Sequence, residues 1–381
     1  MTQGLTQNTR YLLAVVGAVA DGKAAPAPFE GVEPVSFYEE AETHRLSAMV
    51  YHGLFRLGLP ADFIEPFRKA HRLSVMQSLM TDREFARVAS ALEENGLDYC
   101  PLKGYWTREL YPDRTMRKMS DVDLLIHEED TEAYRRVLTE LGYECTRYMA
   151  TTEDVYVFKG MMIEVHRALD DHGLGNPEFY KDPWRLTENV SGHCYKLRTE
   201  DAYLFTVAHT MKHFMYSGIG LRSLADVYVF MKYAALDRDY VESEAKAMGI
   251  DKFLHNIEKT VLVAFGHAEE DEASLEIIGF MADCGTKGSK DNLRAATYLR
   301  SRSKLGYWLS ILFPPLEEMR VRYSVLVKWP VLLPAAYVYR WFALIFVNRK
   351  YLRKGMDQVK HANIEEAERL RRIHRLAGIE K

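Results

Sequence analysis

Residues 101–126 read PLKGYWTRELYPDRTMRKMSDVDLLI, and the end of this stretch decides how the middle of the chain folds. Asp121 and Asp123 stand one residue apart at the start of an apolar run that ends at Ile126. Because successive side chains of a strand point to opposite faces, both carboxylates share one face of a predicted strand over 121–126. Two carboxylates held so close repel each other. The pattern therefore predicts a divalent cation at this strand.

The sequence around this strand alternates between strand and helix signals. The predicted elements are a strand over 97–102, a turn at Lys103 and Gly104, a helix over 105–111, the strand over 121–126, a helix over 130–141, and a hairpin with arms over 155–158 and 161–166. In the second arm of the hairpin, Glu164 shares a face with Met162 and His166. Short strands mixed with helices predict a small mixed sheet within an α+β fold.

Helical periodicity flanks the predicted sheet on both sides. Before it, a long segment over 62–94 has a helical pattern, and Asn95-Gly96 is a typical helix stop. From Glu200 onward the pattern is helical again. We therefore predict three parts: a helical N-terminal region over 1–96, an α/β domain over 97–199 and a helical C-terminal domain over 200–381.

The composition indicates a well-folded chain in a reducing compartment. The 381 residues include 48% hydrophobic and 27% charged residues, which is enough for a substantial core and not typical of disorder. The four cysteines are scattered without a CxxC pair, which argues against a disulfide framework or a structural zinc site and favours the cytoplasm. The apolar run over 12–20 is short and has no clear cleavage context, so we expect a helix there and not a signal peptide.

Charge is distributed unevenly along the C-terminal half. Residues 239–283 hold 11 acidic residues against 3 Lys or Arg, whereas residues 300–356 hold 11 Lys or Arg against 2 acidic residues. The basic segment over 300–356 could contact nucleic acid, an anionic membrane surface or the acidic segment of the same chain. Internal charge pairing and solvated helix faces account for the pattern equally well.

Residues 323–347 are strongly apolar and aromatic. Lys328, Pro330, Pro334 and Arg340 interrupt them, which argues against a transmembrane segment, because a span needs about 20 predominantly apolar residues. Buried helices of the C-terminal domain are the favoured interpretation, since prolines and internal charges fit a folded corner. An amphipathic segment lying on a membrane surface is the alternative.

The strand acids predict a particular kind of metal site. Mg²⁺ is a hard cation that prefers carboxylates, water and phosphate oxygens. A third acid from a neighbouring strand would let two ions lie side by side, and Glu164 is the natural candidate. In the competing interpretation, the strand acids only form ion pairs with nearby cations, namely Arg114, Arg117 or Lys118.

Other polar residues have weaker patterns. His209 and His213 have the spacing of a zinc-binding helix, but Thr210 occupies the position where the metalloprotease pattern has Glu. Packed histidines, or histidines that line a cleft between domains, are the favoured interpretation. Asp226 lies among apolar residues, and we expect a buried acid paired to a helix terminus or to Arg222.

Several of these motifs together resemble a known family. The runs PLKG at 101–104, LYPD at 110–113 and RKMSDVDLLI at 117–126 are similar to the bacterial uncharacterised nucleotidyltransferase family of the DNA polymerase β-like nucleotidyltransferase superfamily. The runs IEVH at 163–166 and LRSLAD at 221–226, and the paired histidines of 209–213, are similar to its downstream pattern. The resemblance implies a sheet-and-helix catalytic domain, two divalent metals (Mg²⁺ or Mn²⁺) and an NTP donor.

The resemblance also implies roles for individual residues. Asp121 and Asp123 would each bind metal, and Glu164 would be the third carboxylate, placed to help deprotonate an acceptor hydroxyl. The superfamily has a Gly-Ser turn around the donor phosphates, whereas this chain has Lys103 and Gly104. A lysine can bind phosphate as a point charge, and a glycine lets the backbone approach closely. The remaining nucleotide contacts that we assign are Arg114, Arg117 and Ser120.

The favoured reaction is Mg²⁺-dependent transfer of a nucleoside monophosphate from an NTP to a hydroxyl or amine, with the acceptor in the cleft between the α/β and C-terminal domains. The acceptor could be a small molecule, a protein or RNA. Because Lys103 and Gly104 replace the Gly-Ser turn, phosphotransfer on the same site is an alternative. RNA modification, with 300–356 contacting the RNA, and a non-catalytic nucleotide-binding or interaction protein are further alternatives.

Overall fold

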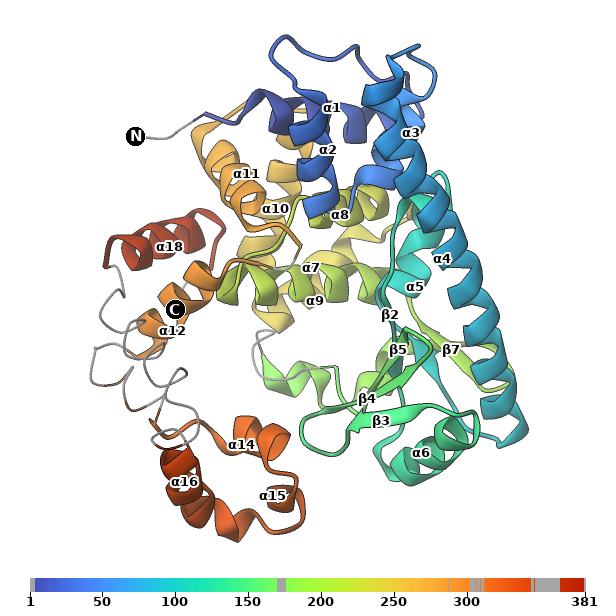
Figure 1. Ribbon diagram of the computed structural model, residues 1–381, viewed down its shortest axis with the longest axis vertical. Coiled ribbons are helices and arrows are strands. Elements are labelled where there is room, and N and C mark those ends of the chain that lie inside the picture. Colours follow the sequence, from blue (N-terminus) through green and yellow to red (C-terminus); the bar gives the residue numbers. More distant parts are fainter. Residues whose placement is uncertain are drawn as a thin grey trace.

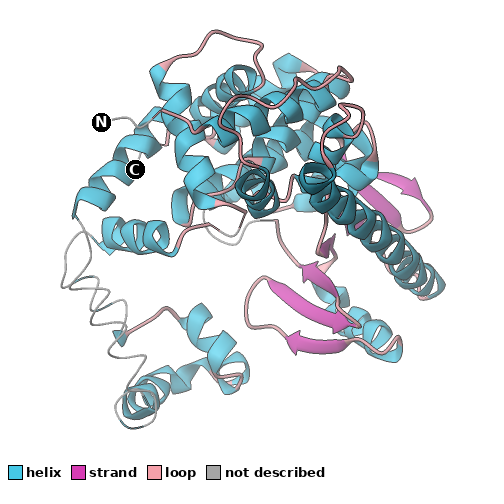
Figure 2. Ribbon diagram, turned by 45° about the horizontal axis from the view of Figure 1, so that its top comes forward, coloured by secondary structure: helices cyan, strands magenta, loops and turns pink. Residues whose placement is uncertain are grey.

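The computed structural model describes residues 4–169, 176–286, 288–301, 312–343 and 364–379, together with 306, 309 and 346. It contains a five-stranded sheet, a two-stranded sheet and helices that flank them (Figure 1). The α+β fold class expected from the sequence is confirmed. Figure 2 shows most of the helices gathered on one side of the five-stranded sheet.

The five-stranded sheet is mixed and has the order β1-β2-β5-β4-β3. Its strands are β1 (Cys100–Pro101), β2 (Asp121–Leu125), β3 (Glu144–Arg147), β4 (Glu153–Phe158) and β5 (Met161–His166). β2 and β5 are parallel, and the other neighbouring pairs are antiparallel. The parallel register places Asp123 directly beside Glu164, and Leu125 beside His166.

Local sequence explains the central strands. β4 and β5 form the expected hairpin, in which Lys159 and Gly160 have φ values of 46° and 85°. Positive φ at both turn positions is typical of the turns that match strand twist. Val122, Leu124 and Ile163 point to one face of the sheet and are almost fully buried. The period of two therefore leaves the acids of β2 and β5 on the other face.

Two helices share the apolar core on the Val122 face. The second half of α4 (Ala61–Glu94) contributes Phe85, Val88 and Leu92, and α6 (Thr131–Glu140) contributes Tyr134 and Leu138. α4 has 34 residues and runs along one side of the molecule from the other helices to the sheet (Figure 1). It therefore links the two parts of the fold.

The remaining helices build a second, larger core. They are α1 (Gln7–Ala20), α2 (Pro34–Thr43), α3 (Ser47–Leu54), α7 (Thr199–Tyr216), α8 (Arg222–Tyr233), α9 (Arg238–Met248), α10 (Asp251–Ala264), α11 (Glu272–Cys284), α12 (Lys290–Ser301) and α18 (Ile364–Leu376). Buried residues from both ends of the chain meet in it, including Tyr11 of α1 and Leu224 of α8. Helices on either side of the sheet segment thus form one body, and the boundaries at 96 and 199 stay predictions.

Some elements lack a clear sequence pattern. The predicted helix over 105–111 consists of α5 (Gly104–Thr107) followed by a 3₁₀ turn (Arg108–Leu110). Neither β3 nor the hairpin of β6 (Thr187–Ser191) and β7 (Cys194–Leu197) was predicted. β6 reads TENVS, and because four of its five residues are exposed it has no apolar alternation to reveal it.

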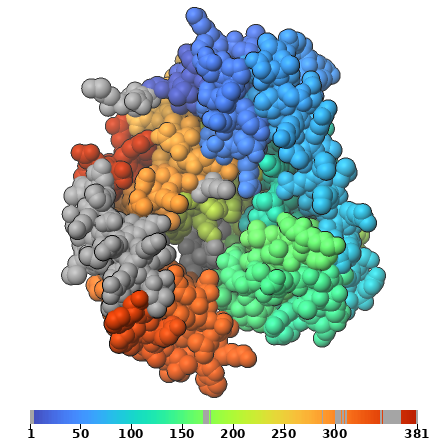
Figure 3. Space-filling model, in the orientation of Figure 1, coloured from blue at the N-terminus to red at the C-terminus, as the bar shows by residue number. Residues whose placement is uncertain are grey.

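The apolar C-terminal segment differs from the favoured expectation. The described part of 323–347 forms α15 (Val325–Lys328), a 3₁₀ turn (Pro330–Leu332) and α16 (Leu333–Phe342), and α14 (Leu316–Arg322) precedes it. This segment lies at the edge of the molecule (Figure 3), and many of its large apolar side chains are exposed, so the expectation of buried helices is wrong for them. No helix in the described residues is long and apolar enough to cross a membrane.

Candidate active site

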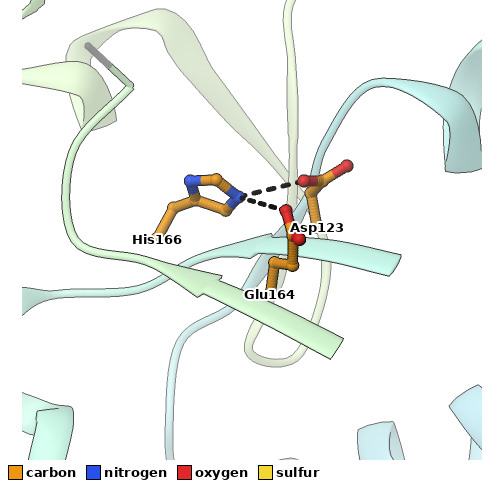
Figure 4. Close-up of side chains that lie close together, drawn as sticks. All are labelled: Asp123, Glu164 and His166. Atoms are coloured by element: carbon orange, nitrogen blue, oxygen red, sulfur yellow. Dashed lines mark hydrogen bonds and ion pairs between the residues drawn. The ribbon is translucent and has the colours of Figure 1, made fainter. Parts of the chain in front are cut away.

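Two carboxylates and one imidazole converge where β2 and β5 lie side by side. Asp123, Glu164 and His166 each offer one ligand atom, and these atoms lie within 4.8 Å of one another. Nε2 of His166 donates to Oδ1 of Asp123 at 3.0 Å and lies 3.8 Å from Oε2 of Glu164 (Figure 4). Within the part of the chain that the structure describes, these three side chains form the one group of three or more potential ligands close enough to hold a metal ion.

Lys103 is the principal cation at this group. Its Nζ donates to Oδ1 of Asp123 at 2.9 Å, and the side chains of both residues are largely buried. Burial alone would raise the pKa of Asp123, but Lys103 and His166 hold it well below its usual value. Lys103 has φ 44°, a backbone conformation that residues other than glycine rarely adopt. The turn therefore holds an ammonium group against the carboxylate of Asp123.

Glu164 is in the opposite electrostatic situation. Its pKa is raised to about 7, first by burial and then by the neighbouring carboxylates of Asp123 and Glu153. A cation bound among these acids would offset their repulsion and stabilise the ionised form of Glu164. The donor set, with carboxylates on two neighbouring strands, therefore fits a hard divalent ion.

Asp121 and Ser120 stand at the start of β2. Asp121 lies on the same face of the strand as Asp123, but it is not in the compact group around His166. Oγ of Ser120 donates to Oδ1 of Asp121 at 3.3 Å and accepts a bond from Nη1 of Arg45 at 3.2 Å. Both Asp121 and Ser120 line the same cavity as Asp123 and Glu164.

This cavity has a volume of about 380 Å³ and lies between the sheet and the helical body. The sequence-predicted residues that line it are Lys103, Gly104, Arg117, Ser120, Asp121, Asp123 and Glu164. Helices α7 and α8 close it from the other side with residues that include His209, Thr210, His213, Arg222 and Asp226. The two parts of the fold thus build the cavity jointly.

A buried ion pair connects the cavity to α8. Nε and Nη2 of Arg117 donate to Oδ1 and Oδ2 of Asp226 at 2.7 and 3.0 Å, and the hydroxyl of Tyr111 donates to Oδ1 at 2.7 Å. Asp226 is therefore the buried acid that the sequence indicated, although it pairs with Arg117. Gly104 is needed here, because a Cβ atom at this position would lie 2.2 Å from Nη1 of Arg117.

The basic residues that follow Pro112 form their direct ion pairs with acids outside β2. Arg114 bonds to Asp82 of α4 at 2.9 Å and does not line the cavity. Lys118 bonds to Glu42 of α2 at 2.8 Å. With Arg117 held by Asp226, the competing interpretation in which these cations pair with Asp121 and Asp123 does not describe the contacts of this structure.

The histidines of α7 line the cavity without forming a zinc site. The rings of His209 and His213 lie 4.4 Å apart between centroids. Burial, reinforced by the charge of Lys103, holds the pKa of His209 well below its usual value, so its imidazole is neutral. His166 joins the carboxylates instead, and the sequence signal for it was its spacing of two residues from Glu164 on one strand face.

The comparison with known families agrees with this geometry. The model of a family described as uncharacterised nucleotidyltransferase matches residues 30–262, which is more than half of the chain. The match includes the whole five-stranded sheet and helices α7 and α8 on the far side of the cavity. Neither the curated proteins nor the solved structures gave a match.

Proposed function

We infer that this chain, which belongs to the uncharacterised nucleotidyltransferase family, transfers a nucleoside monophosphate from an NTP to a hydroxyl or amine and releases pyrophosphate. The observation that carries this proposal is the pairing of Asp123 with Glu164 on adjacent parallel strands, facing a cavity that Asp121 and Lys103 also line. Such a site can neutralise and position a triphosphate, which is most of what this chemistry requires.

Three carboxylates would hold the divalent ions. Asp121 and Asp123 present oxygen ligands from one strand, and Glu164 presents a third from the neighbouring strand. Mg²⁺ or Mn²⁺ bound there would neutralise charge on the triphosphate and lower the pKa of the attacking hydroxyl. His166 orients Asp123 through the bond to its Oδ1, in the way that outer groups commonly fix a ligand.

Positively charged groups on the cavity wall would contact the phosphates. Lys103 carries a point charge on a flexible side chain, and it would contact a phosphate oxygen of the bound triphosphate. Arg117 is held rigidly by Asp226 and presents a fixed guanidinium group. Gly104 keeps the backbone between them free of a side chain, and Ser120 adds a hydroxyl at the start of β2.

The transfer itself forms one bond and breaks one. The acceptor oxygen attacks the α-phosphorus, the bond between that phosphorus and the bridging oxygen breaks, and pyrophosphate leaves with the electron pair. The proton of the acceptor goes to the carboxylate of Glu164. In the metal-free site, burial and the neighbouring carboxylates raise the pKa of Glu164 to about 7, which is in the range suited to a base near neutral pH.

The acceptor would enter through a larger groove beside the cavity. This groove has a volume of about 720 Å³ and shares Arg45, Lys118, Met119, Ser120 and Thr286 with the cavity. Small molecules, proteins and RNA are all open as acceptors. All four cysteines are free thiols, which is consistent with the cytoplasm as the compartment.

Equilibrium binding of NTPs with and without Mg²⁺ or Mn²⁺ tests the proposal. We expect metal-dependent binding that is abolished in the double variant Asp121→Asn and Asp123→Asn and is retained in Asp291→Asn, which neutralises an exposed acid on α12. Metal-independent binding, or full binding by the double variant, contradicts the proposal. With an acceptor present, release of a nucleoside diphosphate in place of pyrophosphate contradicts nucleotidyl transfer and favours phosphotransfer.

A further inference from the structure

One face of α16 is apolar and open to solvent. Its exposed side chains follow helical spacing: Val338 is 47% exposed, Tyr339 65% and Phe342 59%. Phe346 continues the face at 66% exposure, and its ring lies 6.0 Å from that of Phe342 between centroids. Apolar side chains exposed singly are ordinary, but a contiguous group usually marks a site of interaction.

The inner face of α16 carries the groups that form hydrogen bonds. The hydroxyl of Tyr337 donates to the carbonyl of Pro314 at 2.7 Å, and Nε1 of Trp341 donates to the carbonyl of Leu312 at 2.9 Å. Arg340 is only 7% exposed. The helix is therefore inverted relative to an ordinary surface helix, with polar groups inside and apolar groups outside.

The segment that leads into α16 also exposes large apolar side chains. Val325 in α15 is 50% exposed, Trp329 is 61% exposed, and Val331 in the following turn is 78% exposed. We name this set the outer apolar face; it consists of Val325, Trp329, Val331, Val338, Tyr339, Phe342 and Phe346. Tryptophan and tyrosine, which combine an apolar ring with one polar atom, are the residues enriched at membrane–water interfaces.

Charge in the same region is mainly positive: residues 300–356 hold 11 Lys or Arg against 2 acidic residues, Glu317 and Glu318 at the start of α14. Arg322 and Lys328 are exposed beside the outer apolar face. Four more basic residues (Arg349, Lys350, Arg353 and Lys354) follow closely in the sequence. Clusters of four to eight basic residues beside an apolar anchor are typical of attraction to anionic lipid headgroups.

We propose that the outer apolar face docks on a membrane surface that contains anionic lipids. The aromatic and aliphatic side chains would enter the boundary between headgroups and acyl chains, while basic residues contact the phosphates. Complementary charge favours this occupant, because lipid headgroups supply negative charge to a region, 300–356, that holds 11 Lys or Arg against 2 acidic residues. The interaction is peripheral, and it does not depend on the function proposed for the cavity.

Sedimentation of the full-length chain with vesicles tests the proposal. One set of vesicles contains two parts phosphatidylcholine to one part phosphatidylglycerol, and the other contains phosphatidylcholine alone. We expect the protein to sediment with the anionic vesicles, to bind the neutral ones much less, and to be released by salt. The double variant Val338→Ser and Phe342→Ser should bind at least about tenfold more weakly, because two exposed apolar side chains no longer enter the lipid.

The matched control replaces Leu79 and Met80 by serine. These residues are each 64% exposed on α4 and lie outside the outer apolar face. The control should bind vesicles like the unmodified chain, and circular dichroism should show that both double variants are folded. Absence of binding to anionic vesicles, equal binding to neutral vesicles, or unchanged binding by the first variant overturns the proposal. A stable dimer that does not bind vesicles and is dispersed by Phe342→Ser also overturns it, and shows that a second copy covers the face.

Discussion

Nζ of Lys103 lies 2.9 Å from Oδ1 of Asp123, so the chain places its own cation on the carboxylate that we assign to a divalent metal. Two positive charges are not expected to share one carboxylate oxygen without cost. In the proposed mechanism, metal binding and the turn of Lys103 towards a phosphate are therefore linked events.

The variant Lys103→Met tests this linkage. Without the ammonium group, Asp123 keeps its buried charge with only His166 beside it, and we expect the free energy of unfolding to fall by about 3 kcal/mol. Because Mg²⁺ can replace the missing charge, it should stabilise the variant more than the unmodified chain. Urea unfolding with and without Mg²⁺ measures both effects.

Lys181→Met is the control for this variant. Lys181 is 77% exposed in a surface pair with Glu178, so its replacement should change stability by less than about 1 kcal/mol. Equal stability of Lys103→Met and the unmodified chain, or equal stabilisation of both by Mg²⁺, would contradict the proposed linkage.

Gly104→Ala tests the close approach of Arg117. The new Cβ would lie 2.2 Å from Nη1 of Arg117, which cannot move without breaking its bonds to Asp226. We expect a loss of about 2 kcal/mol in unfolding free energy. Asp226→Asn should lower the unfolding free energy less in the Gly104→Ala variant than in the unmodified chain, because both changes disturb the same contact. Gly279→Ala is the control, because its Cβ would meet only Leu5 at 3.8 Å and alanine favours helix. Strict additivity of Gly104→Ala and Asp226→Asn would argue against the shared contact.

The protonation of His44 should contribute to the pH dependence of the free energy of unfolding. It is fully buried, its Nδ1 accepts the N–H of Leu221 at 3.2 Å, and burial lowers its pKa from 6.5 to about 4. Between these values the unfolded chain binds a proton that the folded chain does not, so stability falls as the pH falls through 6.5 towards 4. From about pH 7 to about pH 5 the loss from this one group is roughly 2 kcal/mol.

The variant His44→Gln isolates this contribution. Glutamine offers an oxygen acceptor without a titrating ring, so the difference in stability between the two chains should narrow by roughly 2 kcal/mol from about pH 7 to about pH 5. Urea unfolding at the two pH values gives the comparison, and a constant difference would show that His44 does not bind a proton on unfolding.

Metal affinity should depend on the protonation of Glu164. Because its pKa is about 7, a metal ion must displace a proton below that pH, and apparent Mn²⁺ affinity should rise by up to about tenfold per pH unit towards neutrality. Above it the affinity should level off. Glu164→Gln should bind Mn²⁺ more weakly, and its affinity should no longer depend on pH in this way. Glu178→Gln, at an exposed position, should keep the pH dependence. Calorimetric titration with Mn²⁺ at several pH values measures the slope, and an unchanged slope in Glu164→Gln would remove this residue from the site.

The strand pattern allowed the central part of the site to be predicted. Alternation by two residues placed Asp121 with Asp123, and Glu164 with His166, on single strand faces, because backbone geometry enforces that period. The hairpin at Lys159 and Gly160 follows from turn chemistry in the same way. These features depend only on residues close together in the chain, so a single sequence is enough to predict them.

The partners of the charged side chains could not be predicted in this way. Arg114 and Arg117 are three residues apart and chemically identical, yet one bonds to Asp82 of α4 and the other to Asp226 of α8. The second pair spans 109 residues, and nothing periodic connects its members. The bond between Lys103 and Asp123 likewise depends on the unusual backbone of Lys103, which no residue type specifies.

The sequence pattern also could not predict that the C-terminal apolar segment is exposed. Apolar content alone gives the same signal for a helix buried in a core and for one that faces outward. Whether the apolar side chains are buried or exposed depends on which face of α16 meets Leu312 and Pro314. That face is set by the tertiary contacts of Tyr337 and Trp341.

The most direct test of the central claim is a crystal structure with Mn²⁺ and a non-hydrolysable NTP, in which anomalous scattering locates the metal. We expect Mn²⁺ bound to the carboxylates of Asp121, Asp123 and Glu164, with the triphosphate in the same cavity and Lys103 turned from Asp123 to a phosphate. An NTP bound elsewhere, or a cavity in which Lys103 still bonds to Asp123 and no manganese is present, would contradict that claim.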